Sequence, residues 1–152
     1  MVEWLPKVPG CTLVLLHQRN NMFSLPVRVY IEDTDAGGIV FYANYLKYME
    51  RARTELIRHL GVELRAGLQE NISYVVHSLE VKYHKPARLD DLLMVSAEVL
   101  KVANTYITFT QKVYAECGAL LVSAQVKVAC VSLDEGKPRR LSEKLSCALR
   151  GN

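Results

Sequence analysis

Apolar and polar residues alternate along much of the chain after residue 22, which is the pattern of β-strands with one buried face. The last three alternating segments are separated by short turns, which predicts an antiparallel meander. Pro26 lies in the first segment, and because proline cannot donate to a β-ladder, we expect this strand at a sheet edge or starting at the proline. The five predicted strands cover residues 23–31, 75–83, 93–99, 107–113 and 122–130.

The period changes to that of an amphipathic helix over residues 44–60. Asn44 is the predicted N-cap, and Gly61 is the predicted residue just beyond the C-terminal end. A short second helix is expected over residues 143–149, with Ser142 as its cap. The apolar face of the long helix carries Tyr45, Tyr48, Met49, Ala52, Leu56, Ile57 and Leu60.

The predicted order is one strand, one long helix and four strands. The chain has 152 residues, of which 50% are hydrophobic and 23% charged, so we expect one ordinary globular domain. One helix cannot cover both faces of a five-stranded sheet. We therefore predict an α+β fold in which a five-stranded antiparallel sheet wraps around one long central helix and pairs with the sheet of another subunit.

The predicted domain covers residues 23–145, between an N-terminal extension at 1–22 and a C-terminal tail at 146–152. Val8-Pro9-Gly10-Cys11 resembles a lipoprotein cleavage box, but its apolar residues follow the cysteine instead of preceding it. Export is therefore not expected. Met22 stands directly before the first strand, and we hypothesise that translation begins there.

The four cysteines and four histidines show none of the spacings of metal ligands, so no metal site is expected. Widely separated thiols are typical of a reducing compartment. The longest apolar runs are too short for a transmembrane helix. We expect a cytoplasmic protein with no membrane insertion.

The net charge of +3 is unevenly distributed, because residues 137–152 carry +4 and residues 1–136 carry −1. Nucleic-acid binding is not expected, since no strand interleaves aromatic with basic residues. A basic end on a neutral domain suits a smaller polyanion, such as the phosphates of a nucleotide.

The segment between the first strand and the long helix is the strongest candidate for chemistry. Residues 32–38 read Glu-Asp-Thr-Asp-Ala-Gly-Gly and break the alternation. N–H groups at a helix entrance carry partial positive charge and suit the developing oxyanion of an acyl group. Asp35 could act beside them as base or nucleophile. The same residues would also suit a loop without chemistry, because acids near a helix start are common.

Three motifs carry a family resemblance. Asp-Thr-Asp-Ala-Gly-Gly-Ile-Val-Phe-Tyr-Ala-Asn-Tyr at 33–45 is similar to the signature of the 4-hydroxybenzoyl-CoA thioesterase group of hotdog-fold enzymes. Residues 27–38, with Glu-Arg-Ala-Arg-Thr-Glu-Leu at 50–56 and Pro-Ala-Arg-Leu-Asp-Asp at 86–91, resemble the YbgC family, the acyl-CoA thioesterases associated with the Tol-Pal system of Gram-negative bacteria. The similarity runs from about residue 23 to 145.

The resemblance implies the hotdog fold, in homodimers commonly paired into homotetramers. It also implies hydrolysis of acyl-CoA without a cofactor, coenzyme A being part of the substrate. It places the catalytic aspartate at Asp35 and the N–H that polarises the thioester carbonyl on the backbone of Tyr42. Many YbgC members have histidine at this position, and the aromatic-CoA branch often has tyrosine; a backbone N–H is present with either side chain.

For the phosphates of coenzyme A, the resemblance points to the basic segment after the last strand, with Arg139 as the closest match and Lys137 beside it. Arg88 is a further candidate for binding coenzyme A. Ser73 corresponds to a position whose backbone lies near the thioester.

Other functions are also compatible with the sequence. The main alternative is a non-catalytic hotdog adaptor that binds acyl-CoA or an acyl carrier protein, and the presence of Asp35 and the Gly37-Gly38 turn favours an enzyme over it. An acyl carrier protein could also present the acyl group to an enzyme. A hotdog dehydratase is disfavoured, because its typical catalytic histidine has no counterpart in the motif.

Overall fold

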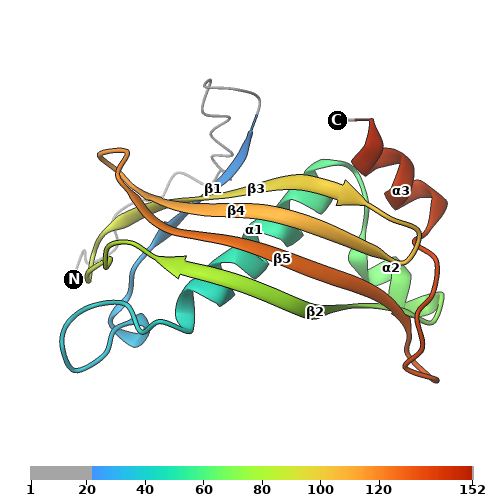
Figure 1. Cartoon of the computed structure of the whole chain (residues 1–152), viewed down its shortest axis with the longest axis horizontal. Helices are drawn as coiled ribbons and strands as arrows, with labels where there is room; N and C mark the ends of the chain where they lie inside the picture. The colour runs from blue at the N-terminus through green and yellow to red at the C-terminus, as the bar shows by residue number, and fades with distance from the viewer. Residues whose placement is uncertain (1–21, 152) are drawn as a thin grey trace, which may run out of the picture.

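The computed structural model describes residues 22–151 (Figure 1). A single 3-10 turn, Ile31–Asp33, follows the first strand. The predicted extension at 1–22 lies outside the described residues, apart from Met22. The helices and strands are β1 (Phe23–Arg28), α1 (Asn44–His59), α2 (Leu64–Gln69), β2 (Ile72–Tyr83), β3 (Leu92–Val102), β4 (Tyr106–Ala115), β5 (Leu120–Ser132) and α3 (Glu143–Arg150).

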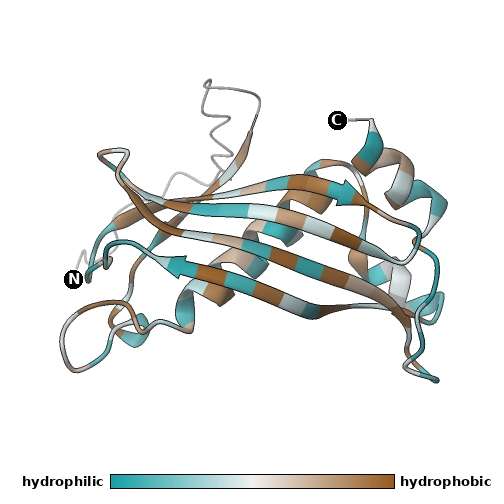
Figure 2. Ribbon diagram, in the orientation of Figure 1, coloured by the Kyte–Doolittle hydropathy of each residue, from teal (hydrophilic) through white to brown (hydrophobic). Residues whose placement is uncertain are grey.

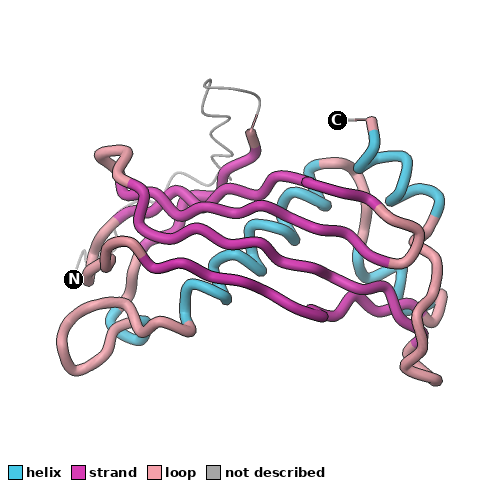
Figure 3. Tube along the Cα trace, in the orientation of Figure 1, coloured by secondary structure: helices cyan, strands magenta, loops and turns pink. Residues whose placement is uncertain are grey.

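The five strands form one antiparallel sheet in the order β1-β3-β4-β5-β2 (Figure 3). β3, β4 and β5 form the predicted meander. β1, which contains Pro26, pairs only with β3 and is an edge strand as predicted. β2 forms the opposite edge, beside β5.

The sheet curves around α1, which packs mainly against β1 and β3 (Figure 1). Hydropathy alternates along the strands, so one face of the sheet contributes to the core and the other faces outward (Figure 2). The predicted fold, a five-stranded antiparallel sheet around one long helix, is confirmed. None of the helices within residues 22–151 is long and apolar enough to cross a membrane. The largest fully buried apolar side chains are Tyr48, Phe109, Met49, Leu93, Ile107 and Leu145.

The start of α1 differs from the prediction. Ala43 is the N-cap, and Asn44 is the first residue inside the helix. The Asn44 side chain is drawn to the preceding loop, because its amide Nδ2 donates to the carbonyl of Asp33 at 2.8 Å. The other end of the helix agrees with the prediction, since Gly61 follows it with a φ of 80°.

The two short helices, α2 and α3, differ in how well the sequence predicted them. α2 was not predicted, because six residues that include Gly67 are too short to show a helical period. α3 begins where predicted, and the Ser142 hydroxyl accepts from the Leu145 N–H at 3.2 Å. This helix crosses the domain limit placed at residue 145, and Leu149 belongs to the hydrophobic core.

The core position of Leu93 provides a stability test. Leu93 is 0% exposed on β3, whereas Leu100 on the same strand is 57% exposed. Leu93→Ala should lower the free energy of unfolding by about 2–5 kcal/mol, because it removes buried methyl groups and leaves a cavity. Leu100→Ala should change it by less than about 0.5 kcal/mol. Urea denaturation measures both, and equal effects would contradict this assignment of the core.

Candidate active site

Asp35 lies in the loop that connects the 3-10 turn to α1. Its N–H donates to the Ile39 carbonyl at 2.9 Å, and its own carbonyl accepts from the Gly38 N–H at 3.0 Å. The carboxylate Oδ1 accepts from the Gly37 N–H at 2.8 Å, while the side chain as a whole stays exposed. A Cβ at Gly37 would come within 3.2 Å of that oxygen, so a glycine suits this position. The loop thus fixes a carboxylate while leaving it open to solvent.

The entrance of α1 has free backbone donors. The Phe41 N–H donates to the Asp33 carbonyl, and the Asn44 N–H donates to the Phe41 carbonyl, both at 2.9 Å. No side chain caps the helix at Ala43, and within residues 22–151 the N–H groups of Tyr42 and Ala43 have no acceptor. These groups lie at the positive end of the helix dipole, so they can receive a partly negative oxygen.

Tyr83, at the end of β2, holds this entrance in place. Its hydroxyl donates to the carbonyl of Tyr42 at 3.0 Å. The Tyr83 ring lies 6.4 Å from the Tyr42 ring and 5.8 Å from the Tyr45 ring, between centroids. The sequence pattern predicted Tyr83 only as a strand residue. The two residues are 41 positions apart, and a contact over that distance leaves no pattern in the local sequence from which it could be predicted.

Two buried tyrosines on α1 differ in their polar contacts. The Tyr45 hydroxyl accepts from the Ala87 N–H at 2.9 Å; burial raises the pKa of Tyr45, and this hydrogen bond opposes the rise. The Tyr48 hydroxyl is buried and has no hydrogen-bond partner within the described part of the chain. Burial, followed by the nearby Asp33 carboxyl, raises the pKa of Tyr48. Asp33 itself accepts from the Tyr30 N–H at 2.9 Å, which fixes the 3-10 turn.

The residues predicted to bind coenzyme A fall into two groups. Arg88 lies beside the Asp35 loop, because it forms an isolated antiparallel bridge with Ile39. Ser73 is at the start of β2, opposite Val131, and Val131 in turn bridges to Pro138 between the two basic candidates. Figure 1 shows the loop before α1 and the segment after β5 at opposite ends of the sheet. A single chain therefore does not bring all the predicted residues together.

The two basic candidates after β5 have contacts of their own. Arg139 Nη1 donates to the carbonyls of Glu70 at 2.6 Å and Asn71 at 3.2 Å, so this side chain anchors the turn between α2 and β2. Lys137 Nζ lies 3.5 Å from Glu135 Oε2 on the surface. The described residues contain no group of three or more His, Cys, Asp or Glu side chains that could hold a metal ion.

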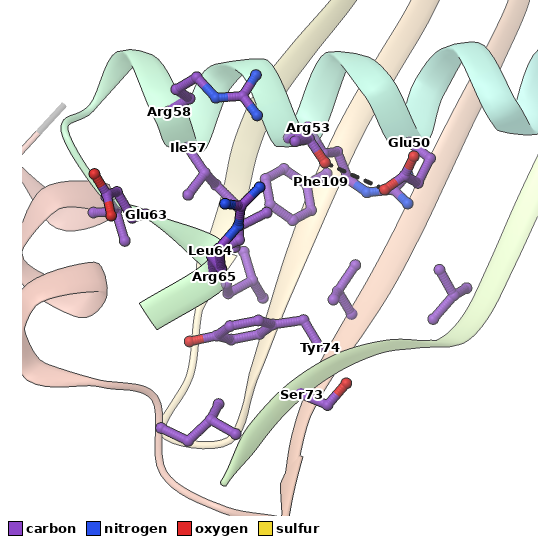
Figure 4. A pocket seen from close by; sticks show the side chains of 16 residues that line it. Glu50, Arg53, Ile57, Arg58, Glu63, Leu64, Arg65, Ser73, Tyr74 and Phe109 are labelled. Carbon is purple, nitrogen blue, oxygen red and sulfur yellow. Dashed lines mark hydrogen bonds between the residues drawn. The ribbon is translucent and has the colours of Figure 1, made fainter. Parts of the chain in front are cut away.

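A groove runs between α1 and β2. It consists of two cavities, of about 700 and 490 Å³, which share Glu50, Arg53 and Val76 in their walls. The smaller cavity begins at Leu46, near the helix entrance. The larger cavity extends to α2 and includes Ser73 in its lining (Figure 4). The groove therefore leads away from the entrance of α1 along the uncovered inner face of β2.

Arg53 is the unexpected residue of this groove. It is 8% exposed, and its Nη1 donates to Gln111 Oε1 at 2.8 Å. Burial lowers the pKa of Arg53, and the nearby Glu50 opposes this. The sequence contained a signal for it, because Tyr45, Met49, Arg53 and Ile57 follow one another at intervals of four. A charged residue in an apolar helix stripe is unusual, and the sequence reasoning did not single it out.

Comparison with known proteins gives a consistent result. The model of the thioesterase superfamily matches residues 37–122. The acyl-CoA thioesterase YbgC of Haemophilus influenzae is 45% identical over 85% of this chain and 95% of its own length. The acyl-CoA thioester hydrolase YbgC of Escherichia coli O6:H1 is 43% identical over 82% of this chain and 92% of its own length. A solved probable thioesterase from Bartonella henselae is 32% identical, with a TM-score of 0.71, over 79% of this chain and 97% of that one.

The curved sheet around one helix, with a carboxylate loop at the helix entrance, defines a hotdog protein of the thioesterase class. The chain belongs to the thioesterase superfamily. Its similarity to the two YbgC proteins confirms the predicted resemblance and the predicted enzyme class, a thioester hydrolase.

The two tyrosines of α1 provide a matched pair of substitutions. Tyr45→Phe leaves the buried Ala87 N–H without its acceptor, and should lower the free energy of unfolding by about 1–3 kcal/mol. Tyr48→Phe removes a buried hydroxyl that lacks a partner within residues 22–151, and should leave stability unchanged or raise it. Denaturant titration compares them, and a larger loss for Tyr48→Phe would contradict the contacts described.

Proposed function

We propose that the protein hydrolyses acyl-CoA thioesters at the entrance of α1. The observation that carries the proposal is the pair of free N–H groups at Tyr42 and Ala43, at the positive end of the helix. The loop that precedes them fixes an exposed carboxylate at Asp35. The acyl-CoA substrate is taken from the printed functions of the two YbgC relatives.

In the proposed reaction the thioester carbonyl oxygen accepts from the Tyr42 N–H, which stabilises the negative charge that develops on it. Asp35 acts in one of two ways. As nucleophile, its carboxylate attacks the carbonyl carbon, the C–S bond breaks, coenzyme A leaves as thiolate, and water hydrolyses the mixed anhydride. As general base, it takes a proton from a water molecule that attacks the same carbon and expels the same thiolate.

Tyr83 and Asn44 support this geometry from two sides. The Asn44 N–H fixes the Phe41 carbonyl, and because the peptide is planar this also fixes the direction of the Tyr42 N–H. Tyr83 holds the next carbonyl of the chain, that of Tyr42. The donor for the carbonyl oxygen is therefore set before substrate arrives, as electrostatic stabilisation of a transition state requires.

Binding of coenzyme A is proposed to need two chains. β2 is an open sheet edge with a row of exposed apolar side chains: Val75, Val76, Leu79 and Tyr83. Antiparallel pairing of two β2 strands would place the Tyr83 end of one chain beside the Ile72 end of the other. Three residues of one chain would then approach the Asp35 loop and Arg88 of the other chain: Arg139, Lys137 and Ser73. This pairing would unite the residues predicted to bind coenzyme A in a homodimer or homotetramer.

The resemblance to the YbgC family alone supports the remaining expectations. These are a cytoplasmic location, an association with the Tol-Pal system, and an acyl carrier protein as a possible donor of the acyl group in place of coenzyme A.

Replacing the carboxylate tests the chemistry. Asp35→Asn should lower kcat by about a hundredfold or more, because an amide is neither a nucleophile nor a base of comparable strength. Glu32→Gln is the matched control, since Glu32 is an exposed acid of the adjoining turn with no hydrogen-bond partner among the described side chains, and it should retain normal turnover. The assay is release of coenzyme A thiol from short, long and aromatic acyl-CoAs. Near-normal turnover in Asp35→Asn would rule out its role, and no hydrolysis by the native protein would favour the adaptor.

Introducing a charge on the open edge tests the assembly. Val75→Lys places a cation on the exposed edge strand, and should convert the oligomer to monomers with a parallel loss of turnover. Leu100→Lys, at an exposed apolar position of β3 inside the sheet, should leave the mass unchanged. Light scattering after gel filtration reports the mass. A native monomer with full activity would contradict the two-chain site.

A further inference from the structure

The groove between α1 and β2 contains a buried cation without a counter-ion. The only hydrogen bond that Arg53 makes within the described residues is to a neutral amide, Gln111, and no carboxylate there lies within ion-pair distance. The Tyr48 hydroxyl is the only fully buried side-chain polar atom of those residues that lacks a partner. No Arg53 nitrogen is among such atoms, so the remaining N–H donors of Arg53 are accessible to solvent. Since Arg53 lines both cavities, these donors face the groove.

Gln111 holds the guanidinium in a fixed position. Its Nε2 donates to the carbonyls of Met49 at 2.9 Å and Ser96 at 3.2 Å, which turns Oε1 towards Arg53. Both donors of this amide are thus used within the core, and Gln111 cannot reorient without losing them. Arginine remains protonated under all ordinary conditions. A cation held in place with free donors in a largely buried setting is suited to bind an anionic group.

The walls of the groove indicate what else the ligand must carry. Leu46, Val76 and Leu79 line the part nearest the helix entrance, and Ile57 and Phe109 line the far part (Figure 4). An apolar chain fits these walls. Glu50, the acid that lines the groove together with Arg53, accepts from the Thr54 hydroxyl at 3.2 Å. Cations outnumber anions around the groove: Lys47, Arg51, Arg53, Arg58 and Arg65 against Glu50 and Glu63.

We propose that this groove binds the acyl group and that Arg53 binds a carboxylate at the end of that group farthest from the thioester. The preferred substrate class is then the monothioester of a dicarboxylic acid with an apolar chain of medium length. The inference rests on the proposed function, because it takes the Tyr42 N–H as the position of the carbonyl. Arg53 lies about 14 Å along the axis from Asn44, at ~1.5 Å per residue. Side chains on a helix point back towards its N-terminus, which shortens the distance to be bridged.

The anion could also be a phosphate of coenzyme A, so the test separates the two sources. Four thioesters form a matched set: octanoyl and 7-carboxyheptanoyl (suberyl) groups, each attached either to coenzyme A or to N-acetylcysteamine, which carries no phosphate. The native protein should hydrolyse the suberyl thioester with a higher kcat/KM than the octanoyl thioester on both carriers.

Three variants accompany this set. Arg53→Met should lower kcat/KM for suberyl thioesters by about ten- to a hundredfold on both carriers, and change octanoyl thioesters by less than about threefold, because only the diacid loses a charged hydrogen bond. Arg53→Lys should recover part of the preference. Arg58→Met is the matched control, because Arg58 lines the same groove but pairs with Glu55 at its rim, and it should leave the preference unchanged.

Two kinetic results would overturn the inference. Equal losses on octanoyl and suberyl thioesters would assign Arg53 a structural role, and losses that follow coenzyme A instead of the acyl group would assign it to phosphate. Calorimetry with methyl esters, whose ester group replaces the thioester, covers the cases in which Arg53→Met does not fold or no thioester is hydrolysed. Monomethyl suberate, which carries a carboxylate at its far end, should bind the native protein more tightly than methyl octanoate, whether or not there is turnover. Equal binding overturns the carboxylate site, whereas tighter binding of monomethyl suberate without any hydrolysis contradicts only the proposed reaction.

Discussion

Much of this structure follows from the difference in width between one helix and a sheet of five strands. A helix with its side chains is about 10–12 Å across, whereas five strands at about 4.8 Å spacing extend over about 19 Å. α1 therefore packs on β1 and β3 and leaves the inner face of β2 uncovered. The groove and the uncovered side chains on the inner face of β2 follow from that difference in width, whereas the open edge follows from the position of β2 at the end of the strand order. A second helix on this face would have given a larger core and no room for a ligand.

The missing cap at the start of α1 has a similar importance. A cap made by the Asn44 side chain, as the sequence suggested, would have accepted an N–H from the first turn of the helix, two or three residues further along the chain. Asn44 lies one residue too late for this, and its amide binds the Asp33 carbonyl instead. Ala43, in the cap position, has no polar side chain to offer. The helix therefore begins without the side-chain cap that stabilises most helix starts. Free N–H donors cost stability and are useful only to a ligand, so their presence here favours a functional site.

Much of the fold could be predicted because its signals are local. Five alternating segments and one helical period were enough to give the strands, the long helix and the meander. α2 had no such signal, being short and interrupted by Gly67. Within the candidate site, residues 33–45 resemble a family signature, so Asp35 and Tyr42 could be proposed from the sequence, and their catalytic roles stay predictions. Contacts between distant segments could not, and so the hydroxyl of Tyr83 on the helix entrance was not anticipated.

Charge patterns were harder to interpret than apolar ones. Arg139 was selected from a basic cluster, and part of its guanidinium holds the turn before β2. Arg53 stood in an apolar stripe, where a charge is a stronger sign of function than in a cluster, since a buried cation is costly unless it has a partner. The position of a charge relative to the apolar pattern was thus more informative than the number of charges.

β2 connects these observations, because it is fixed at both ends and uncovered between them. Tyr83, the last residue of β2, is hydrogen-bonded to the helix entrance. Arg139 holds the turn that precedes the first residue of the strand. Between these ends the register with β5 shifts at His77, so that Val76 lies opposite Val128 while Leu79 lies opposite Val126. Without this bulge, residues three apart would point to opposite faces of the sheet. With it, both side chains line the groove, so the bulge lengthens the apolar wall that a bound chain would contact.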